Sequence, residues 1–463
     1  MKLRRVLKIL GIVLGALLLA GGIAAKVLFG GVDSSRKHVT GTLFRDVTKK
    51  SGIDFHFHGD IFDAKLIPTM GSGVALADFD GDGHLDVLLV QQVKSGNAYR
   101  KAGRTQKLKD CARLYKNRGD GTFEDVTASS GIRACGWGIS ALWADLDNDG
   151  HVDLVIGNAG EEDTVWKNNG NGTFTKIEKT GLPKTGFTVG MTAFDANGDG
   201  IPDLYIGHYL DTDPDRESAA SGLGFKTPDE YPGQDNVLLA GKGDLTFFDV
   251  TGKTGTKDPG SKTIGVAAFD YDGDGWTDLY VANDQWRNTL FHNEGYGRYR
   301  DVSDETGTGY PQDGGTAFGR RTRSGMGLAV ADLDGDNRPD LFVTNYANEP
   351  NTLLRNVGGA TFEEADRAAF GGDADPSIPL SGWGTVAFDY DDDGKEELAV
   401  STGQIMSRLF TVLAGWLNPI GKNFAVGEKS YAQRQLLFHN ESSPGKMSFR
   451  DVSAESGDFG RIT

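Results

Sequence analysis

The chain has 463 residues, of which 38% are hydrophobic and 66 are glycine, and its formal net charge is −17. This composition is typical of an extended β-rich body with many turns. Because the chain is acidic and has no basic stripe, nucleic acid is excluded as an expected partner.

The first 31 residues combine a basic start, with Lys2, Arg4, Arg5 and Lys8, and a long apolar run. The run approaches the roughly twenty residues that span a bilayer, so residues 1–31 predict a signal anchor with one transmembrane helix. A cleaved signal peptide is the alternative and would give a secreted product. In both cases the basic flank leaves the rest of the chain outside the cytoplasm, on the periplasmic or extracellular side. A polar linker follows at residues 32–40.

From residue 78 onward, a nine-residue acidic pattern occurs six times, with carboxylate or amide side chains at positions one, three, five and nine. The copies begin at Asp78, Asp145, Asp195, Asp270, Asp332 and Asp389. Each copy lies between two β-type runs, so each unit reads as strand, acidic loop, strand. The recurrence indicates that residues 41–463 form one repeat array rather than several domains.

The ligand positions in these loops predict Ca²⁺, which accepts six to eight oxygen ligands in flexible geometry. Position six is glycine in five loops and Asn337 in the fifth, as expected for a sharp turn with φ > 0. The loops are not EF-hands, because position twelve of the first loop is Leu89 and a strand follows. A solvated acidic turn would explain one copy but explains six copies in register poorly.

At position seven we expect the backbone carbonyl to be the ligand. The predicted ligands, for up to six Ca²⁺ ions, are Asp78, Asp80, Asp82, His84, Asp86, Asp145, Asp147, Asp149, His151, Asp153, Asp195, Asn197, Asp199, Ile201, Asp203, Asp270, Asp272, Asp274, Trp276, Asp278, Asp332, Asp334, Asp336, Arg338, Asp340, Asp389, Asp391, Asp393, Lys395 and Glu397.

Two further phrases recur in each unit: an apolar run that usually ends in asparagine, as at residues 114–117, and a Phe-x-Asp-Val-Thr tail, as at residues 123–127. They predict a third and a fourth strand. A four-stranded antiparallel sheet repeated radially is the blade of a β-propeller. The predicted fold is therefore all-β, a propeller of six recognisable blades.

The combination of these tails with the acidic loops and with Gly-x-Gly-x-Ala-x-x-Asp leads, as at residues 71–78 and 325–332, resembles FG-GAP/VCBS repeats. These are the repeats of integrin-α-like propellers, and the chain is most similar to the cartilage acidic protein (ASPIC/UnbV-related) type. The resemblance covers roughly residues 41–457 and implies a calcium-binding propeller. The C-terminal ASPIC/UnbV segment of such relatives and a further repeat are not found. Two closures therefore stay open: residues 41–70 cover the seam of a six-bladed ring, or they build a partial seventh blade with the C-terminus.

Three insertions are individual to single units: a basic stretch at 91–110, a stretch rich in proline, aspartate and glycine at 209–235, and an apolar one at 404–430. The last predicts an amphipathic helix. Loops on a rigid scaffold usually carry binding specificity, so we expect a protein partner to bind through one of them.

The function predicted is a membrane-anchored extracytoplasmic calcium-binding propeller that acts as a protein-interaction, adhesion or scaffold module. One alternative is an accessory subunit of a membrane protein complex. Another is a polysaccharide-active lyase or hydrolase with a site in the propeller channel. The sequence has no nucleophile elbow, P-loop or dinucleotide fingerprint, so no catalytic residue is assigned.

The cysteine and histidine residues add little to the functional prediction. Cys111 and Cys135 are the only cysteines, and both a disulfide between the first two blades and two buried thiols stay open. The eight histidines form no zinc-ligand spacing, and His292 and His439 lie at equivalent strand ends.

Overall fold

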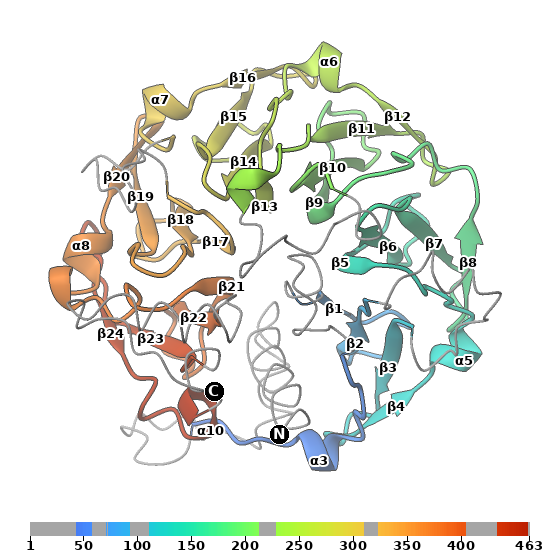
Figure 1. Cartoon of the computed structure of the whole chain (residues 1–463), viewed down its shortest axis with the longest axis horizontal. Helices are drawn as coiled ribbons and strands as arrows, with labels where there is room; N and C mark the ends of the chain where they lie inside the picture. Colours follow the sequence, from blue (N-terminus) through green and yellow to red (C-terminus); the bar gives the residue numbers. More distant parts are fainter. Residues whose placement is uncertain are drawn as a thin grey trace.

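The computed structural model describes residues 43–57, 71, 73–92, 111–212, 228–309, 323–403 and 433–461. Strands in these residues form six antiparallel sheets of four strands each. The sheets are arranged as blades around a centre, with the first strand of each blade innermost and the fourth at the rim (Figure 1). The protein is therefore a six-bladed all-β propeller, as the sequence predicts.

The strands follow one another from the centre to the rim in every blade. Blade 1 is β1 (Val74–Ala77), β2 (Asp86–Leu89), β3 (Arg113–Asn117) and β4 (Phe123–Asp125); blade 2 is β5 (Gly138–Ala144), β6 (Asp153–Asn158), β7 (Thr164–Asn168) and β8 (Phe174–Ile177). Blade 3 is β9 (Thr188–Phe194), β10 (Asp203–His208), β11 (Val237–Gly241) and β12 (Phe247–Asp249); blade 4 is β13 (Thr263–Phe269), β14 (Asp278–Asn283), β15 (Thr289–Asn293) and β16 (Tyr299–Asp301). Blade 5 is β17 (Leu328–Ala331), β18 (Asp340–Val343), β19 (Thr352–Gly358) and β20 (Thr361–Glu364); blade 6 is β21 (Gly382–Phe388), β22 (Glu397–Thr402), β23 (Leu436–Asn440) and β24 (Phe449–Asp451).

Burial along the strands follows from their place in the blade. Every residue of β2, β6, β10, β14 and β18 is buried, because both faces of a second strand contact neighbouring sheets. This explains their continuous apolar runs. The outermost strands β4, β12 and β16 bury only their first residue, an aromatic one, and expose the next two.

The core consists of apolar layers between adjacent blades. Between blades 1 and 2, for example, Leu88 and Leu114 lie in one cluster with Leu154, Ile156 and Trp166. Equivalent clusters join blades 2 and 3, 3 and 4, 4 and 5, and 5 and 6. Each blade is thus stabilised by its neighbours, as expected for a repeat array.

Residues 43–57 cross the seam between blade 6 and blade 1. Phe44 packs in the blade 6 cluster, whereas Ile53 and Phe55 pack in the blade 1 cluster. Phe44 also forms a single parallel bridge with Gly457, next to helix α10 (Asp458–Arg461). In the described part of the chain, the seam carries this bridge and no seventh sheet, in agreement with the first of the two predicted closures.

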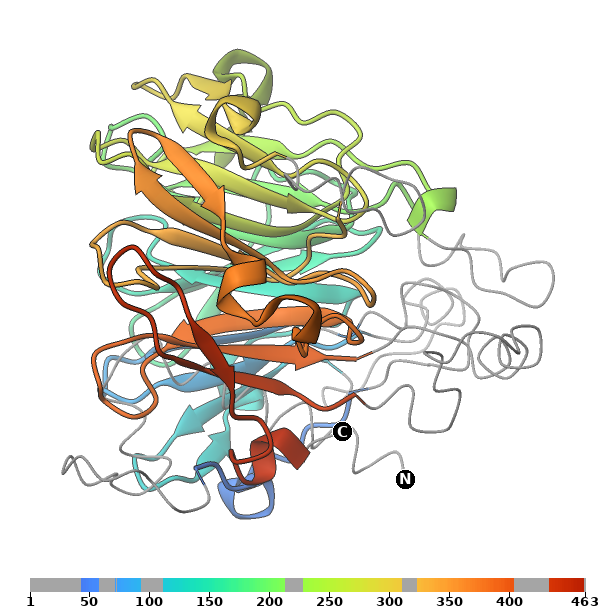
Figure 2. The same cartoon turned by 90° about the vertical axis from the view of Figure 1, so that its left-hand side faces the viewer.

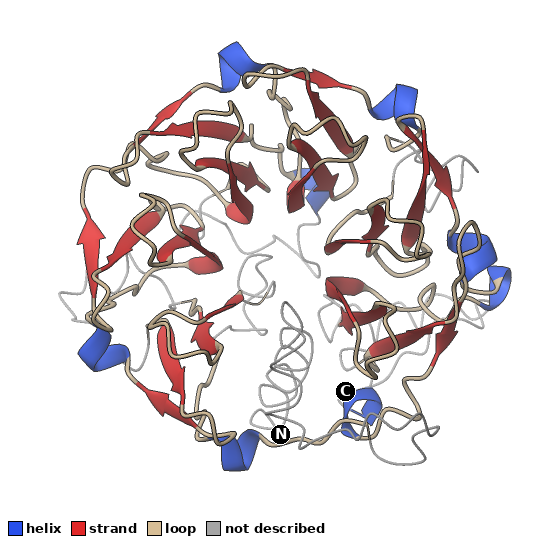
Figure 3. Ribbon diagram, turned by 180° about the vertical axis from the view of Figure 1, so that it is seen from behind, coloured by secondary structure: helices blue, strands red, loops and turns tan. Residues whose placement is uncertain are grey.

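Short helices follow the outer strands along the rim (Figure 3). They are α3 (Thr48–Ser51), α5 (Thr127–Ser130), α6 (Thr251–Thr254), α7 (Ser303–Thr306) and α8 (Asp366–Ala369), and two 3₁₀ turns are η3 (Pro228–Glu230) and η5 (Gly372–Ala374). The Asp-Val-Thr tail connects the outer strand to the helix that follows it. Thr127 donates its backbone N–H to Asp125 Oδ1 at 3.0 Å, and Leu114 N–H donates to Thr127 Oγ1 at 3.0 Å. The tail therefore ties the fourth strand to the third.

The two faces of the disc have different roles. Because the strands of each blade are antiparallel, the acidic loops and the turns between third and fourth strands lie on one face. In the edge-on view of Figure 2, the red hairpin between β23 and β24 points to the left, and η3 lies on the right. The predicted insertions each join a second strand to a third, so their described ends lie on the face opposite the acidic loops. The rest of each insertion, and residues 1–40, lie outside the described residues.

A disulfide joins Cys111 and Cys135, with a Cα–Cα distance of 4.3 Å. It links the approach to β3 with the approach to β5, and so connects the first two blades. Of the two alternatives that the sequence left open, the structure has the disulfide. No helix in the described ranges is long and apolar enough to cross a membrane.

Candidate metal centres

Each acidic loop joins the first strand of a blade to the second and is held by its own carboxylates. In the first loop, Asp78 accepts backbone N–H bonds from Asp82 at 3.0 Å and Gly83 at 2.8 Å, and Asp82 accepts one from His84 at 3.0 Å. Position six has positive φ in all six loops, for example 86° at Gly83 and 66° at Asn337. The predicted left-handed turn is confirmed, and it lets the carboxylates of positions one, three and nine gather on one side.

The ninth-position carboxylate begins the second strand and is buried. Asp86 accepts the N–H of Phe79 at 3.2 Å and that of Asn117, in β3, at 2.7 Å. Burial, together with the nearby charges of Asp80 and Asp82, raises the pKa of Asp86 to about 7. Burial, together with the nearby charges of Asp391 and Asp393, raises the pKa of Glu397 to about 9. A cation in the loop would stabilise the ionised forms of these acids.

The third-position carboxylates provide the observation that fits a bound cation. One buried oxygen has no hydrogen-bond partner in Asp80, Asp147, Asp334 and Asp391, the third-position residues of four loops. A buried carboxylate oxygen without a partner is costly unless a cation binds it. A set of converging carboxylate oxygens matches the ligand preference of Ca²⁺.

The structure brings several of the predicted ligands together. Ligand oxygens of three carboxylates lie within 4.8 Å of one another in loop 1 (Asp78, Asp80 and Asp86), loop 2 (Asp145, Asp147 and Asp153) and loop 4 (Asp270, Asp272 and Asp274). At position seven, the side chains of His84 and His151 lie beside Gly119 and Gly170, in the turns after the third strands. The carbonyl ligands proposed at this position stay predictions.

One residue that faces the acidic loops was not predicted from the sequence: the third-strand residue that directly precedes the recurring Asn or Gly. In blade 1, Lys116 Nζ contacts Asp80 and lies 3.0 Å from Asp82 Oδ2. In blade 2, Lys167 contacts Asp147 and lies 2.7 Å from Asp149 Oδ2. The equivalent residues, in blade order, are Lys116, Lys167, Ala240, His292, Arg355 and His439. These residues share a position directly before Asn or Gly in the third strand, and this position was the sequence signal that could have identified them.

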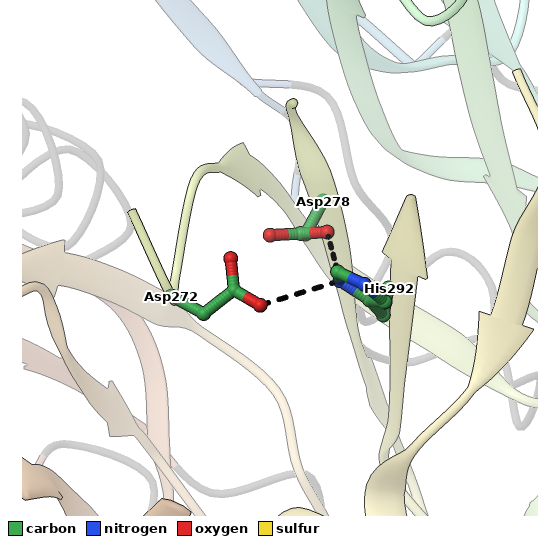
Figure 4. A group of neighbouring side chains, drawn as sticks. All are labelled: Asp272, Asp278 and His292. Carbon is green, nitrogen blue, oxygen red and sulfur yellow. Dashed lines mark hydrogen bonds and ion pairs between the residues drawn. The ribbon is translucent and has the colours of Figure 1, made fainter. Parts of the chain in front are cut away.

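In blades 4 and 6 the equivalent residue is a histidine beside two carboxylates. His292 Nδ1 lies 3.1 Å from Asp278 Oδ1 and 3.6 Å from Asp272 Oδ2, and Figure 4 shows the three side chains converging. In blade 5, Arg355 lies 3.9 Å from Asp334 Oδ2, and Arg338 contacts Asp336. The six loops are therefore alike in backbone but differ in the side chain that faces their carboxylates.

Comparison with known proteins identifies the repeated unit. The FG-GAP-like repeat family matches residues 103–156, 145–206, 270–343 and 332–400, together about half of the chain. Cartilage acidic protein 1 of Homo sapiens is 26% identical over 359 residues, which are 74% of this chain and 49% of that protein. The Xenopus tropicalis protein is 26% identical over 381 residues, which are 77% of this chain and 54% of that protein. The chain spans about half the length of these relatives.

Two solved structures match over part of their length. An Agrocybe aegerita lectin that recognises non-reducing terminal N-acetylglucosamine is 15% identical, with a TM-score of 0.46 and coverage of 84% of this chain and 82% of that one. The Vibrio cholerae biofilm matrix protein Bap1 is 18% identical, with a TM-score of 0.34 and coverage of 68% and 40%. From the repeat match and the relationship to cartilage acidic protein 1, the chain belongs to the FG-GAP-like repeat family of β-propellers.

Proposed function

We propose that the protein is an extracytoplasmic, calcium-stabilised propeller that binds a protein partner as an adhesion or scaffold module and is not an enzyme. The observation that carries this proposal is that the two faces of the propeller present different kinds of loop. Repeated acidic loops occupy one face, and the connections that vary between blades start from the other. A rigid ring that presents variable segments is suited to recognition.

Calcium binding is supported by the carboxylate oxygens that lack partners in four loops. Loop 3 is not one of these four but is a further candidate, because Ala240 occupies the place where other blades carry a lysine, histidine or arginine. The ligands there would be Asp195, Asn197, Asp199 and Asp203. Bound Ca²⁺ would hold the loop carboxylates together against their mutual repulsion.

An extracytoplasmic location is supported by the Cys111–Cys135 disulfide, which persists in oxidising compartments. Residues 1–31 would hold the propeller at the membrane as a signal anchor. Cell fractionation with carbonate washing, followed by N-terminal sequencing of the mature protein, tests this part. A product that starts within residues 20–32 and is recovered in the soluble fraction would contradict the anchor but not the export.

Recognition is tested with the full-length protein carrying a short Gly/Ser linker in place of residues 404–430. We expect a partner cross-linked and co-purified from native membranes with the wild-type protein to be lost with this variant. A second variant with a linker in place of residues 93–109 is the matched control. Calcium-dependent melting should be retained in both variants. Turnover of a polysaccharide by the purified wild-type protein would contradict the proposal and favour an enzyme.

A further inference from the structure

The two histidine-bearing blades differ chemically from the lysine-bearing ones. A lysine ammonium has only donors, so Lys116 and Lys167 can neutralise carboxylates but cannot bind a metal ion. A neutral imidazole has one acceptor nitrogen and is the commonest side-chain ligand of transition metals. His292 in β15 and His439 in β23 therefore place a metal ligand where blades 1 and 2 place a counterion.

Blade 6 contains a buried acid with one oxygen that lacks a hydrogen bond. Glu397 is 0% exposed, and its Oε1 has no hydrogen-bond partner of ordinary geometry. Its other oxygen accepts the N–H of Tyr390 at 3.0 Å. Oε1 lies 3.3 Å from His439 Nδ1, and Asp391 Oδ2 lies 3.8 Å from the same nitrogen. The second oxygen of Asp391 is also buried without a partner. Three potential ligands thus converge with unused acceptor capacity.

Blade 4 places the same kinds of side chain together, but its buried acid has hydrogen bonds to both oxygens. Asp278, which is 0% exposed, accepts the N–H of Tyr271 at 3.1 Å and, through the oxygen that lies near His292, the N–H of Asn293 at 2.7 Å. Asp272 completes the group from position three of the loop (Figure 4). The two clusters are the same in kind: a third-position carboxylate, a ninth-position carboxylate and a third-strand imidazole.

A second feature accompanies histidine in both blades. Only the loops of blades 4 and 6 carry tyrosine at position two, Tyr271 and Tyr390. The Tyr271 ring lies edge-on to His292 with centroids 5.7 Å apart, and the Tyr390 ring lies 6.1 Å from His439. The Tyr390 hydroxyl is 3.4 Å from His439 Nδ1. By packing against the imidazoles, these rings limit their orientation.

The distances between the potential ligands suit a small ion. Bonds of 2.0–2.1 Å in a tetrahedron put neighbouring ligand atoms roughly 3.3 Å apart. The four separations between histidine nitrogen and carboxylate oxygen are 3.1, 3.6, 3.3 and 3.8 Å. Imidazole nitrogen suits zinc and other first-row ions, whereas Ca²⁺ takes oxygen ligands.

We propose that blades 4 and 6 each bind a divalent first-row transition metal ion of the zinc type. The ligands are Asp272, Asp278 and His292 in blade 4 and Asp391, Glu397 and His439 in blade 6. Three protein ligands leave a fourth position open to water or to a donor from a partner. This departs from the calcium proposal in loops 4 and 6, where the same carboxylates would bind a transition metal ion in place of Ca²⁺, and leaves the calcium proposal for the other four loops unchanged.

The test measures Zn²⁺ bound by the full-length protein in excess Ca²⁺, by equilibrium dialysis and elemental analysis. We expect two equivalents per chain. His292→Lys and His439→Lys should each remove one equivalent, and the double variant both. Lysine is the matched control for folding, because blades 1 and 2 carry it at the same place. Cobalt supplies a second readout: Co²⁺-loaded wild-type protein should show tetrahedral visible absorption that halves in each single variant.

The competing possibility is that each histidine only contacts its two carboxylates and binds no metal ion. Wild-type protein that retains no Zn²⁺ in excess Ca²⁺ would establish this and overturn the inference. Equal Zn²⁺ binding by the wild type and the double lysine variant would overturn it as well, since the ion would then be held elsewhere. Calcium-induced melting shifts, measured on the same samples, report separately on the calcium proposal.

Discussion

Asn168 of blade 2 donates its Nδ2–H to the backbone carbonyl of Phe79 in the acidic loop of blade 1, at 2.8 Å. The same amide also reaches the carbonyl of Val152 in its own loop at 3.1 Å. The bond recurs between later blades. Asn293 reaches Ala196, Asn356 reaches Tyr271, and Asn440 reaches Leu333. The asparagine that ends the third strand therefore links the acidic loops of adjacent blades.

Asn168→Ala should lower the free energy of unfolding by about 1–3 kcal/mol, because it leaves buried backbone carbonyls without donors. Asn117→Ala is the matched control. Asn117 ends the third strand of blade 1 and donates to Leu85, within its own blade, at 3.0 Å. Denaturant unfolding of both variants measures the difference. Equal losses would show that the bond between blades adds nothing to the bond within the blade.

Removal of Lys167, the β7 lysine that faces loop 2, should strengthen calcium binding. Lys167→Met leaves Asp147 and Asp149 without their ammonium partner, so the variant should melt below the wild type in EGTA. Saturating Ca²⁺ should then raise its melting temperature by about 2–4 °C more than that of the wild type. Lys176→Met is the control, because Lys176 is exposed and lies 4.0 Å from Glu178 only at the rim. Identical calcium shifts in the two variants would contradict the expectation.

Asp163 should make the stability depend on pH. It is buried, accepts the N–H of Asn158 at 2.7 Å and the hydroxyl of Thr188 at 2.8 Å, and burial raises its pKa to about 7. Because the folded pKa lies above the ordinary value, its contribution is complete below about pH 4 and is lost as the pH rises through about 7.

Asp163→Asn should remove this loss and stabilise the protein by roughly 1–3 kcal/mol at about pH 8. Other blades support the choice, since Asn236, Asn288 and Asn351 accept the equivalent backbone N–H. Thermal melting of wild type and variant between about pH 5 and about pH 8, in EGTA, is the measurement. A constant difference across this range would mean that Asp163 does not titrate there.

Loss of the disulfide should weaken the junction of blades 1 and 2. Cys111 and Cys135 are separated by 24 positions, and a closed loop of this size contributes about 3 kcal/mol through the unfolded chain. The double variant Cys111→Ser/Cys135→Ser should lose stability of this order in denaturant titrations. Wild-type protein under reducing conditions is the control and should lose the same amount. If stability fell only in the reduced wild type and not in the double variant, the fall would come from another effect of the reductant.

The sequence by itself determined the blade. Strand, acidic loop, strand and closing tail are local patterns, and the left-handed turn at Gly83 or Asn337 follows from residue type within nine positions. The fourth strand was recognisable for the same reason, since Asp125 and Thr127, which form its closing hydrogen bond, are only two positions apart.

The tertiary structure decided what faces each loop and what joins the blades. Lys116 lies 36 positions from Asp80, and His439 lies 49 positions from Tyr390, so only the pairing of the second and third strands places them together. The contact of Asn168 with Phe79 spans 89 positions and depends on the packing of one blade against the next. The path of residues 43–57 across the seam was likewise decided by the tertiary structure, because it depends on where blade 6 lies relative to blade 1. Local patterns fix a backbone turn, but the chemistry of a loop depends on side chains that long-range packing brings to it.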